Sequence, residues 1–407
     1  MSSRSIITGI DIGTHFVKVV IANSDERNER GFPRIIGVGQ AESRGLRHGY
    51  VTNLNEVTLS IAAAIEEAEK RAQVKIKRAF VSIGGIGLAG VTSTSAVIVS
   101  RGDQEISALD VKKLHDQCEK DIPPSASLNR KIIHNIPLQY KIDGKTVLGK
   151  PEGMKGSRME VKMLYVTCLE QHLNDILQAV NEAGIKVQDV MAAPIAASLV
   201  TLSKSQKIAG CILANIGAET VSIAVFENNV PVSLEVFPIG STDITNDIAL
   251  GLKVPLEEAE QLKIGAISGT SYPRKKLEEI VEARLSDIFE LIEAHLKKIG
   301  RNGLLPAGII ITGGGAGLGT IEDMAKAALK LPSRIGSITS SSGQADGSSG
   351  AGASNKQSYK DATWAVAYGL CIFGVNADGS DEDLPQAGMD FGKTFRQLGA
   401  WFKQFLP

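Results

Sequence analysis

Residues 6–21 read IITGIDIGTHFVKVVI, and in this stretch two apolar runs flank the turn Asp11-Ile12-Gly13-Thr14. The pattern predicts two strands joined by a short turn. Gly13 lets the backbone approach an anion closely, and turn amides can point at phosphate oxygens. Thr14 adds a hydroxyl, Lys18 adds a compact positive charge for a β- or γ-phosphate, and Asp11 is suited to holding a hydrated Mg²⁺ ion. Taken alone, however, the stretch is better explained as an ordinary hairpin.

The same pattern returns in residues 211–226, which read CILANIGAETVSIAVF. An apolar strand leads into the turn Asn215-Ile216-Gly217-Ala218-Glu219-Thr220, and a second apolar strand follows it. Asn215 occupies the place that Asp11 holds in the first turn. This repetition predicts a duplicated fold with a binding site between its halves. Two such turns facing each other would hold a phosphate chain from both sides.

A third glycine-rich element, AGIIITGGG at residues 307–315, places Gly313, Gly314 and Gly315 directly after an apolar strand. Bare backbone of this kind suits close approach to a flat base or to phosphates. A glycine triplet alone is a weak signal, because many strand-to-helix turns contain one. Three elements in this order are harder to dismiss, and together they predict a nucleotide site.

Length and composition limit the classes of protein that remain. The chain has 407 residues, too many for one core, so two or more subdomains are expected. A net charge of −1 argues against an electrostatic grip of the whole chain on nucleic acid. The four cysteines are widely spaced, which argues against a zinc site or a disulfide framework and fits a reducing cytoplasm. We expect no export signal and no membrane-spanning helix, so any membrane contact would be peripheral.

The remaining segments alternate in type along the chain. A separate insert is expected from about residue 91 to residue 166, and a flexible surface loop is expected at 336–358, where Ser and Gly dominate. Periodicity and apolar runs predict strands at 35–41, 79–83, 131–140, 160–167 and 307–312, and helices at 55–72, 107–120, 171–183, 242–252, 256–264, 275–299 and 362–375.

The C-terminal tail has the pattern of an amphipathic helix. Its large apolar residues recur at steps of four and three, which places them on one helical face: Phe391, Phe395, Leu398, Phe402 and Phe405. Trp401 flanks this face, and Lys393, Arg396 and Lys403 lie off it, where they would meet anionic headgroups. Docking on the protein's own core is the commoner fate of such a helix. The acidic linker at 378–388 and the concentration of aromatic residues favour membrane binding instead.

The order of these elements resembles the superfamily of actin, the Hsp70 chaperones and the sugar kinases. The spacing Asp11-x-Gly13-Thr14-x-x-x-Lys18 is similar to the first phosphate loop of actin. Within the superfamily the chain most resembles the FtsA family of bacterial cell-division proteins. Residues 307–314 are similar to the FtsA adenosine loop, and EAEQLK at 258–263 is similar to the helix that passes the adenosine, which implies a role there for Glu260 and Lys263. The insert and the amphipathic tail also lie where FtsA has them.

This resemblance implies an α/β, actin-like ATPase fold with two duplicated ribonuclease-H-like halves, an inserted small subdomain and a C-terminal amphipathic helix. The implied division of the chain is residues 1–83 and 166–192 for the first half, with part of 359–377 packing back on it; 84–165 for the inserted subdomain; 193–241 and 303–358 for the second half; 242–302 for a small helical subdomain; 378–388 for a linker; and 389–407 for the membrane-binding helix.

The resemblance also implies a structural role in division. The protein would bind ATP and Mg²⁺ and polymerise head to tail on the cytoplasmic face of the bacterial inner membrane, with residues 84–165 touching the next subunit. At the division site it would bind the C-terminal tail of the tubulin-like protein FtsZ through residues 242–302 and help recruit later division proteins. No nucleic-acid partner is expected.

Two departures from the superfamily pattern bear on catalysis. The second loop usually begins with Asp, but Asn215 stands there, and Glu219 would repel phosphate unless it meets Mg²⁺ or turns away. Relatives carry a catalytic Gln or Glu where this chain has Ala193. Because such a group typically contributes about 10²- to 10⁴-fold, we expect ATP binding with slow or negligible hydrolysis and assign no catalytic residue.

Two alternatives stay open at this point. A small-molecule kinase on the same fold would need a catalytic carboxylate, which Asn215 and Ala193 do not supply. A scaffold of pilus or secretion machinery would share the nucleotide loops but has no need of the terminal helix. Binding of an FtsZ tail peptide would separate the scaffold from the division protein.

Overall fold

The computed structural model describes residues 5–28, 30–100, 102–266, 272–338 and 361–378. The linker predicted at 378–388, apart from its first residue, lies outside the described residues, as do the amphipathic tail and most of the loop expected at 336–358. No helix among the described residues is long and apolar enough to cross a membrane.

Two five-stranded sheets dominate the described part of the chain, and they have the same topology. In each, a central strand pairs antiparallel with a hairpin partner on one side and parallel with a later strand on the other. The first sheet has the order β11-β6-β1-β2-β3, from β11 (Lys186–Ala192), β6 (Arg78–Ile83), β1 (Ile6–Ile12), β2 (Phe16–Arg27) and β3 (Pro33–Glu42). The second has the order β14-β13-β12-β15-β16, from β14 (Val230–Phe237), β13 (Val221–Glu227), β12 (Cys211–Ile216), β15 (Ile309–Thr312) and β16 (Ser333–Ile335).

The two predicted hairpins are matched residue by residue. Asp11 pairs with Lys18 across the first, and Asn215 pairs with Ser222 across the second. Each turn is closed by the same kind of backbone bond, from the Gly13 amide to the Phe16 carbonyl at 3.2 Å and from the Gly217 amide to the Thr220 carbonyl at 2.8 Å. The duplication expected from the sequence is confirmed.

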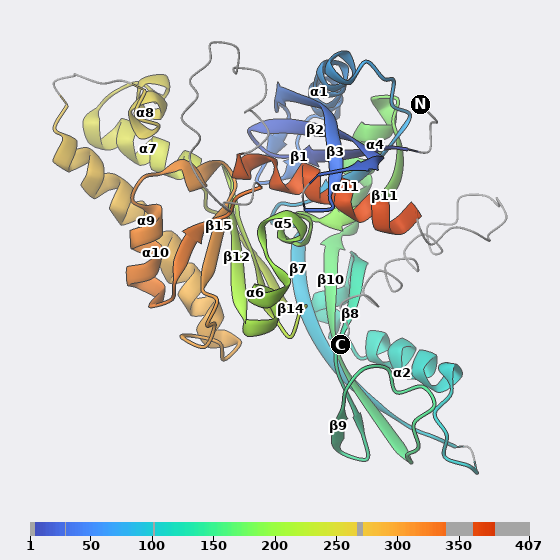
Figure 1. The fold of residues 1–407 in the computed structure, drawn as a ribbon. Coiled ribbons are helices and arrows are strands. Elements are labelled where there is room, and N and C mark those ends of the chain that lie inside the picture. The colour runs from blue at the N-terminus through green and yellow to red at the C-terminus, as the bar shows by residue number, and fades with distance from the viewer. Residues whose placement is uncertain (1–4, 29, 101, 267–271, 339–360, 379–407) are drawn as a thin grey trace.

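A buried helix joins the two halves. Figure 1 shows α11 (Ala365–Asp378) crossing the middle of the molecule between the first sheet and α5 (Ala193–Thr201). The packing there is too close for larger residues: a Cβ built on Gly369 would lie 1.9 Å from the carbonyl oxygen of Ala196. The sequence predicted the helix over 362–375, but a short 3-10 turn, η2 (Ala362–Trp364), precedes it.

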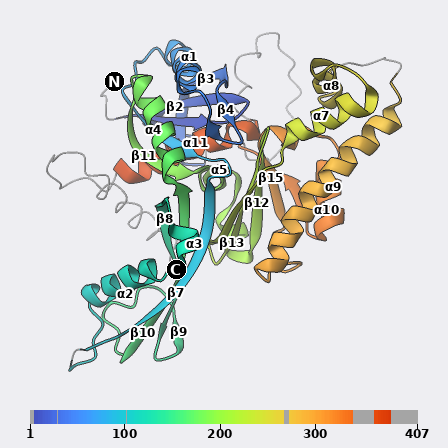
Figure 2. The ribbon, with the colours of Figure 1, turned by 180° about the vertical axis from the view of Figure 1, so that it is seen from behind.

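The insert is a separate unit that projects from the first half (Figures 1 and 2). Its described residues form a sheet of order β7-β10-β8-β9 with its own apolar core. Ser107 caps the main helix through a reciprocal capping box with Asp110, which explains why that helix starts where the sequence predicts. The elements are β7 (Leu88–Ile98), α2 (Ala108–Lys120), α3 (Pro124–Ser127), β8 (Arg130–Ile142), β9 (Lys145–Val147) and β10 (Arg158–Leu169).

Helices cover the outer faces of both sheets. The first half carries α1 (Leu54–Ala72), α4 (Glu170–Glu182) and a small hairpin of β4 (Leu46–Arg47) and β5 (Tyr50–Val51). The second half carries α6 (Lys204–Ala209), α7 (Ser241–Leu252), α8 (Leu256–Lys263), α9 (Arg274–Lys298), the 3-10 turn η1 (Gly314–Gly317) and α10 (Ile321–Leu329). The last strand before η1 begins at Ile309 and not at 307, because Gly308 adopts φ +73° where a Cβ would collide with the Pro332 carbonyl.

Candidate functional site

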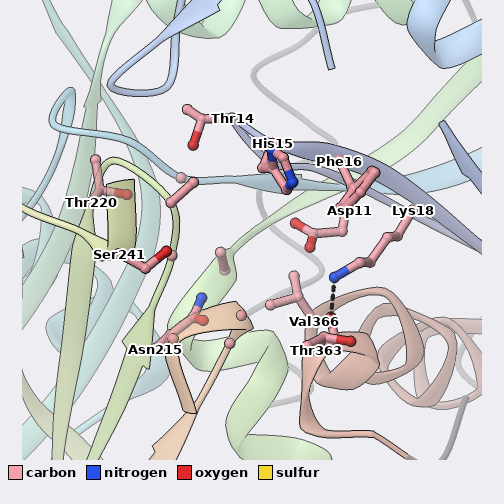
Figure 3. A pocket seen from close by; sticks show the side chains of 18 of the residues that line it. Asp11, Thr14, His15, Phe16, Lys18, Asn215, Thr220, Ser241, Thr363 and Val366 are labelled. Atoms are coloured by element: carbon pink, nitrogen blue, oxygen red, sulfur yellow. Dashed lines mark hydrogen bonds between the residues drawn. The ribbon is translucent and has the colours of Figure 1, made fainter. Parts of the chain in front are cut away.

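A cavity of about 550 Å³ lies between the two halves. Its walls come from both hairpin turns, the glycines after β15, the loop after β6, helix α8 and the segment that enters α11. Figure 3 shows Asp11 and Lys18 on one side of it and Asn215 and Thr220 on the other. The duplicated fold therefore brings together segments that are far apart in the sequence.

Asp11 and Lys18 lie opposite each other on β1 and β2, half-buried, and carry opposite charges at the cavity wall. The Ser82 hydroxyl donates to Asp11 Oδ1 at 2.7 Å. Burial raises the pKa of the Asp11 carboxyl, against the lowering effects of Lys18 and the Ser82 bond. Burial likewise lowers the pKa of the Lys18 ammonium, against the charges of Asp11 and Asp361. A phosphate entering the cavity would give this cation a further anionic partner beside Asp11 and Asp361.

Lys18 also anchors the segment that enters α11. Its Nζ donates to the Thr363 carbonyl at 2.9 Å and lies 5.7 Å from the centre of the Trp364 ring. Asp361 caps this segment by accepting from the Thr363 amide at 3.1 Å, and Thr312 Oγ1 donates to the Ala362 carbonyl at 2.7 Å. The sequence analysis did not include this wall in the site. One feature of the sequence could have indicated this wall: Asp361 stands two residues before Thr363 at the start of an apolar run. That is the pattern of a capped helix start.

The second turn is held by helix α7. The amides of Ser241 and Thr242 donate to the carbonyls of Gly217 and Ala218 at 2.9 and 2.8 Å. A Cβ built on Gly240 would lie 2.2 Å from the Ala218 carbonyl oxygen, so only glycine allows this approach. The turn and the helical subdomain therefore form one packed unit.

Glu219 is turned away from the cavity. Its carboxylate accepts a hydrogen bond from the backbone amide of His48, and it does not line the cavity wall. The repulsion of phosphate that its charge would cause inside the cavity is thus avoided by its orientation.

The three glycines after β15 differ in their surroundings. Gly313 adopts φ +89°, and a Cβ there would lie 2.4 Å from Asn215 Oδ1. A Cβ on Gly315 would lie 2.5 Å from Ile216 Cγ2, whereas one on Gly314 would meet nothing within 4 Å. Packing therefore requires glycine at positions 313 and 315. Gly314 leaves bare backbone exposed in the cavity wall, and a flat ligand could lie against it.

Helix α8 contributes an ion pair to the far wall. Lys263 Nζ lies 2.7 Å from Glu260 Oε2 and also donates to Thr245 Oγ1 at 2.9 Å and to the Ser241 carbonyl at 3.1 Å. Burial disfavours the Glu260 anion, but the hydrogen bonds from Lys263 and Thr245 outweigh it and lower the pKa of Glu260. The Glu260 carboxylate is therefore held in place beside the cavity by Lys263 and Thr245.

No carboxylate or amide side chain stands at the β11–α5 junction, where Ala193 lines the cavity. Among the described residues no group of three or more His, Cys, Asp or Glu side chains is arranged to hold a metal ion. The carboxylates that line the cavity are those of Asp11, Glu260 and Asp361.

All of the residues predicted for the nucleotide site except Glu219 line this cavity: Asp11, Gly13, Thr14, Lys18, Asn215, Gly217, Ala218, Thr220, Glu260, Lys263, Gly313, Gly314 and Gly315. The cavity adds lining residues that the sequence analysis did not assign: Ser82, Gly84, Gly85, Ser241, Asp361, Thr363 and Trp364. The predicted membrane residues lie outside the described residues.

Two family models match this chain, one over the second half and one over the insert. Residues 212–369 match "Cell division protein FtsA", and residues 89–167 match "SHS2 domain inserted in FTSA". The FtsA of Bacillus subtilis is 30% identical over 358 residues, covering 83% of this chain and 80% of that protein. The chain belongs to the FtsA family of cell division proteins. The inserted sheet of this FtsA-family chain is accordingly the SHS2 domain.

Solved structures of similar fold support the architecture. A chain of the PilM–PilN type IV pilus biogenesis complex superposes with a TM-score of 0.66 at 16% identity, covering 91% of this chain and 98% of that one. MreB5 of Spiroplasma citri bound to ADP superposes with a TM-score of 0.51 at 12% identity, covering 94% and 100%. At such identities the likeness shows the fold alone, which is the actin-like ATPase fold.

Proposed function

We propose that this FtsA-family protein binds ATP with Mg²⁺ between its two halves, polymerises on the cytoplasmic face of the bacterial inner membrane, and tethers FtsZ at the division site. The observation that carries the proposal is the cavity where the two matched turns, Lys18 and the bare backbone at Gly314 meet. Lys18 and the turn amides suit a phosphate chain, and the glycine wall suits a flat base.

Each wall has a part in this binding. The amides of the turns at 13–16 and 217–220 and the ammonium of Lys18 would hold the phosphates. Gly313 to Gly315 and the Glu260–Lys263 pair would border the adenosine. Asp11 would hold Mg²⁺ through water, and the ion would neutralise phosphate charge. Because Ala193 supplies no base and no water-positioning group, hydrolysis would be slow or negligible.

Filament formation and partner binding would use the two subdomains that project from the halves. The inserted subdomain at residues 84–165 would contact the next subunit head to tail. The helical subdomain at residues 242–302 would bind the C-terminal tail of FtsZ, and the filament would help recruit later division proteins. Helix α7 of the helical subdomain packs on the turn at 217–220. Partner binding and nucleotide binding would therefore involve the same packed unit.

Membrane attachment would come from the amphipathic tail at residues 389–407. Each large apolar side chain contributes at most about 1.5–3 kcal/mol when fully buried, and partial burial and helix ordering reduce this. A single tail would thus bind weakly and reversibly. A filament presents many tails and gains from avidity, which couples polymerisation to the membrane.

Co-sedimentation with anionic vesicles in the presence of ATP and Mg²⁺ tests the proposal. The intact chain is compared with a chain truncated after Gly388 and with Phe402→Glu. We expect the intact chain to pellet with the vesicles and both variants to stay in solution. If the intact chain binds ATP and yet stays in solution with both variants, the tail docks on the core and a soluble actin-fold protein is favoured.

A further inference from the structure

His48 connects three segments at the edge of the cavity. Its backbone amide donates to the carboxylate of Glu219, and its Nδ1 lies 3.1 Å from the Glu219 carbonyl oxygen. Because a carbonyl only accepts hydrogen bonds, Nδ1 carries the proton. The His48 carbonyl in turn accepts from the Ile86 amide at 3.1 Å. The residue thus joins the β4–β5 hairpin to the loop after β6 and to the second phosphate turn.

The backbone around His48 is fixed in the orientation that these bonds need. His48 has φ +49° and Gly49 has φ +89°, both in the left-handed region. A Cβ built on Gly49 would lie 2.4 Å from the Cα of Gly85, so the two glycines pack backbone against backbone. This contact holds the β4–β5 turn against the loop after β6 and leaves the His48 amide free to reach Glu219.

The contact spans the two halves of the molecule beside the proposed phosphate site. His48 belongs to the first half, and Glu219 belongs to the turn between β12 and β13 of the second. Gly84 and Gly85 line the cavity on the side of His48, and Gly217 and Ala218 line it on the side of Glu219. The bonds between His48 and Glu219 join the two halves at this point, and movement of the halves apart would break them.

We propose that Glu219 is a positioning residue that latches the two halves together and slows release of the bound nucleotide. This inference rests on the proposed nucleotide binding. The carboxylate does not line the cavity but accepts a charge-assisted hydrogen bond from the other half, and such hydrogen bonds are stronger than neutral ones. The latch accounts for an acidic residue in a turn that would otherwise repel phosphate.

Release of mant-ATP, measured by stopped-flow fluorescence on the full-length chain, tests the latch. We expect Glu219→Ala to speed release about tenfold, the change that a loss of about 1.4 kcal/mol produces, with little change in the association rate. Glu219→Gln loses the charge but keeps an oxygen that accepts from the same amide, so it should release mant-ATP more slowly than Glu219→Ala. A merely structural role would not separate the two rate constants in this way.

Glu322→Ala is the matched control. Glu322 on α10 also accepts a hydrogen bond from a backbone amide, that of Ile335, but both partners lie in the second half. This variant should release mant-ATP at the rate of the unmodified chain. Equal release rates for Glu219→Ala and Glu322→Ala would overturn the inference, as would failure of Glu219→Gln to slow release.

Amide hydrogen exchange without nucleotide tests the latch independently of ATP binding. Peptides that contain the His48 amide should exchange faster in Glu219→Ala than in the unmodified chain. In Glu322→Ala their exchange rate should equal that of the unmodified chain. Unaltered exchange at His48 in Glu219→Ala would overturn the latch. If the unmodified chain does not bind mant-ATP at all, the proposed function fails, and the exchange result still decides whether the contact holds the halves together.

Discussion

The glycines after β15 make different contacts and should respond differently to the same substitution. Gly314→Ala adds a methyl group into open space at the cavity wall, so it should leave the fold intact and weaken ATP binding. Gly315→Ala places a methyl group 2.5 Å from Ile216 Cγ2 and should destabilise the protein by about 1–3 kcal/mol through overpacking.

Thermal unfolding and equilibrium ATP binding of both variants check this pair. The expected pattern is an unchanged melting temperature with weaker binding for Gly314→Ala, and a lowered melting temperature for Gly315→Ala. Weak binding and low stability in both variants would mean that Gly314 is also required by packing, contrary to its surroundings here.

At the scale of single residues, the sequence predicted which residues would meet but not how each would be oriented. Asp11, Gly13 and Lys18 could be assigned because their chemistry follows from one short turn. The orientation of Glu219 depends on His48, which lies 171 positions away along the chain, and no local pattern indicates that contact. The same holds for Thr363, which reaches Lys18 across 345 positions.

At the scale of elements, strand β11 carries an acid with an unusual environment. Asp189 is buried at a β-bulge against β6, where its Oδ1 accepts from the Val190 amide at 2.8 Å. Burial raises the pKa of its carboxyl to about 7, against the lowering effect of this hydrogen bond. In the unfolded chain the pKa of an Asp carboxyl is near 3.9. Between about pH 4 and pH 7 the folded state therefore binds more protons at this group than the unfolded state does.

This difference predicts a pH dependence of stability. The free energy of unfolding should fall as pH rises through this window, by about 1–3 kcal/mol between pH 5 and pH 8 from this group. Asp189→Asn cannot ionise, so its stability should change less over the same range. Urea unfolding at both pH values measures the difference, and an identical pH dependence in the two proteins would show that Asp189 stays ionised when folded.

Elements with clear periodicity could be predicted from the sequence, and uniformly apolar ones could not. Helix α1 shows a buried stripe with charges opposite, and its predicted range of 55–72 is close to the observed Leu54–Ala72. Helix α5 is apolar on almost every side because α11 and the sheets surround it, so it has no period to detect. Strand β14 also went unpredicted, although it pairs along β13.

At the scale of the whole molecule, the helical subdomain carries exposed apolar residues. Leu250 on α7 is 78% exposed. Leu59 on α1 lies outside the proposed surface and is similarly exposed, at 69%. Leu250→Glu should weaken binding of an FtsZ C-terminal peptide about tenfold or more, because an apolar anchor in an interface contributes on the order of 1–3 kcal/mol. Leu59→Glu is the control and should bind as the unmodified chain does.

Fluorescence anisotropy of a labelled FtsZ peptide measures these affinities. Equal weakening by both substitutions would indicate a general loss of structure, and no weakening by Leu250→Glu would move the FtsZ site away from this face of α7.

The duplication, the insert and the nucleotide loops of the whole molecule could be recognised in the sequence because each repeats or interrupts a pattern. The closure of the two halves could not, since it depends on contacts such as His48 with Glu219 and Lys18 with Thr363 that join distant segments.

Isothermal titration of Mg²⁺-ATP into the full-length chain measures whether the cavity between the halves binds ATP. Lys18→Gln removes the cation at the cavity wall and keeps a side chain that can donate hydrogen bonds. We predict saturable binding at one site per chain, weakened at least tenfold in Lys18→Gln because hydrogen bonds to charged groups contribute about 1.5–3 kcal/mol. No heat of binding in the folded, unmodified chain, or equal affinity in the two proteins, would contradict the account.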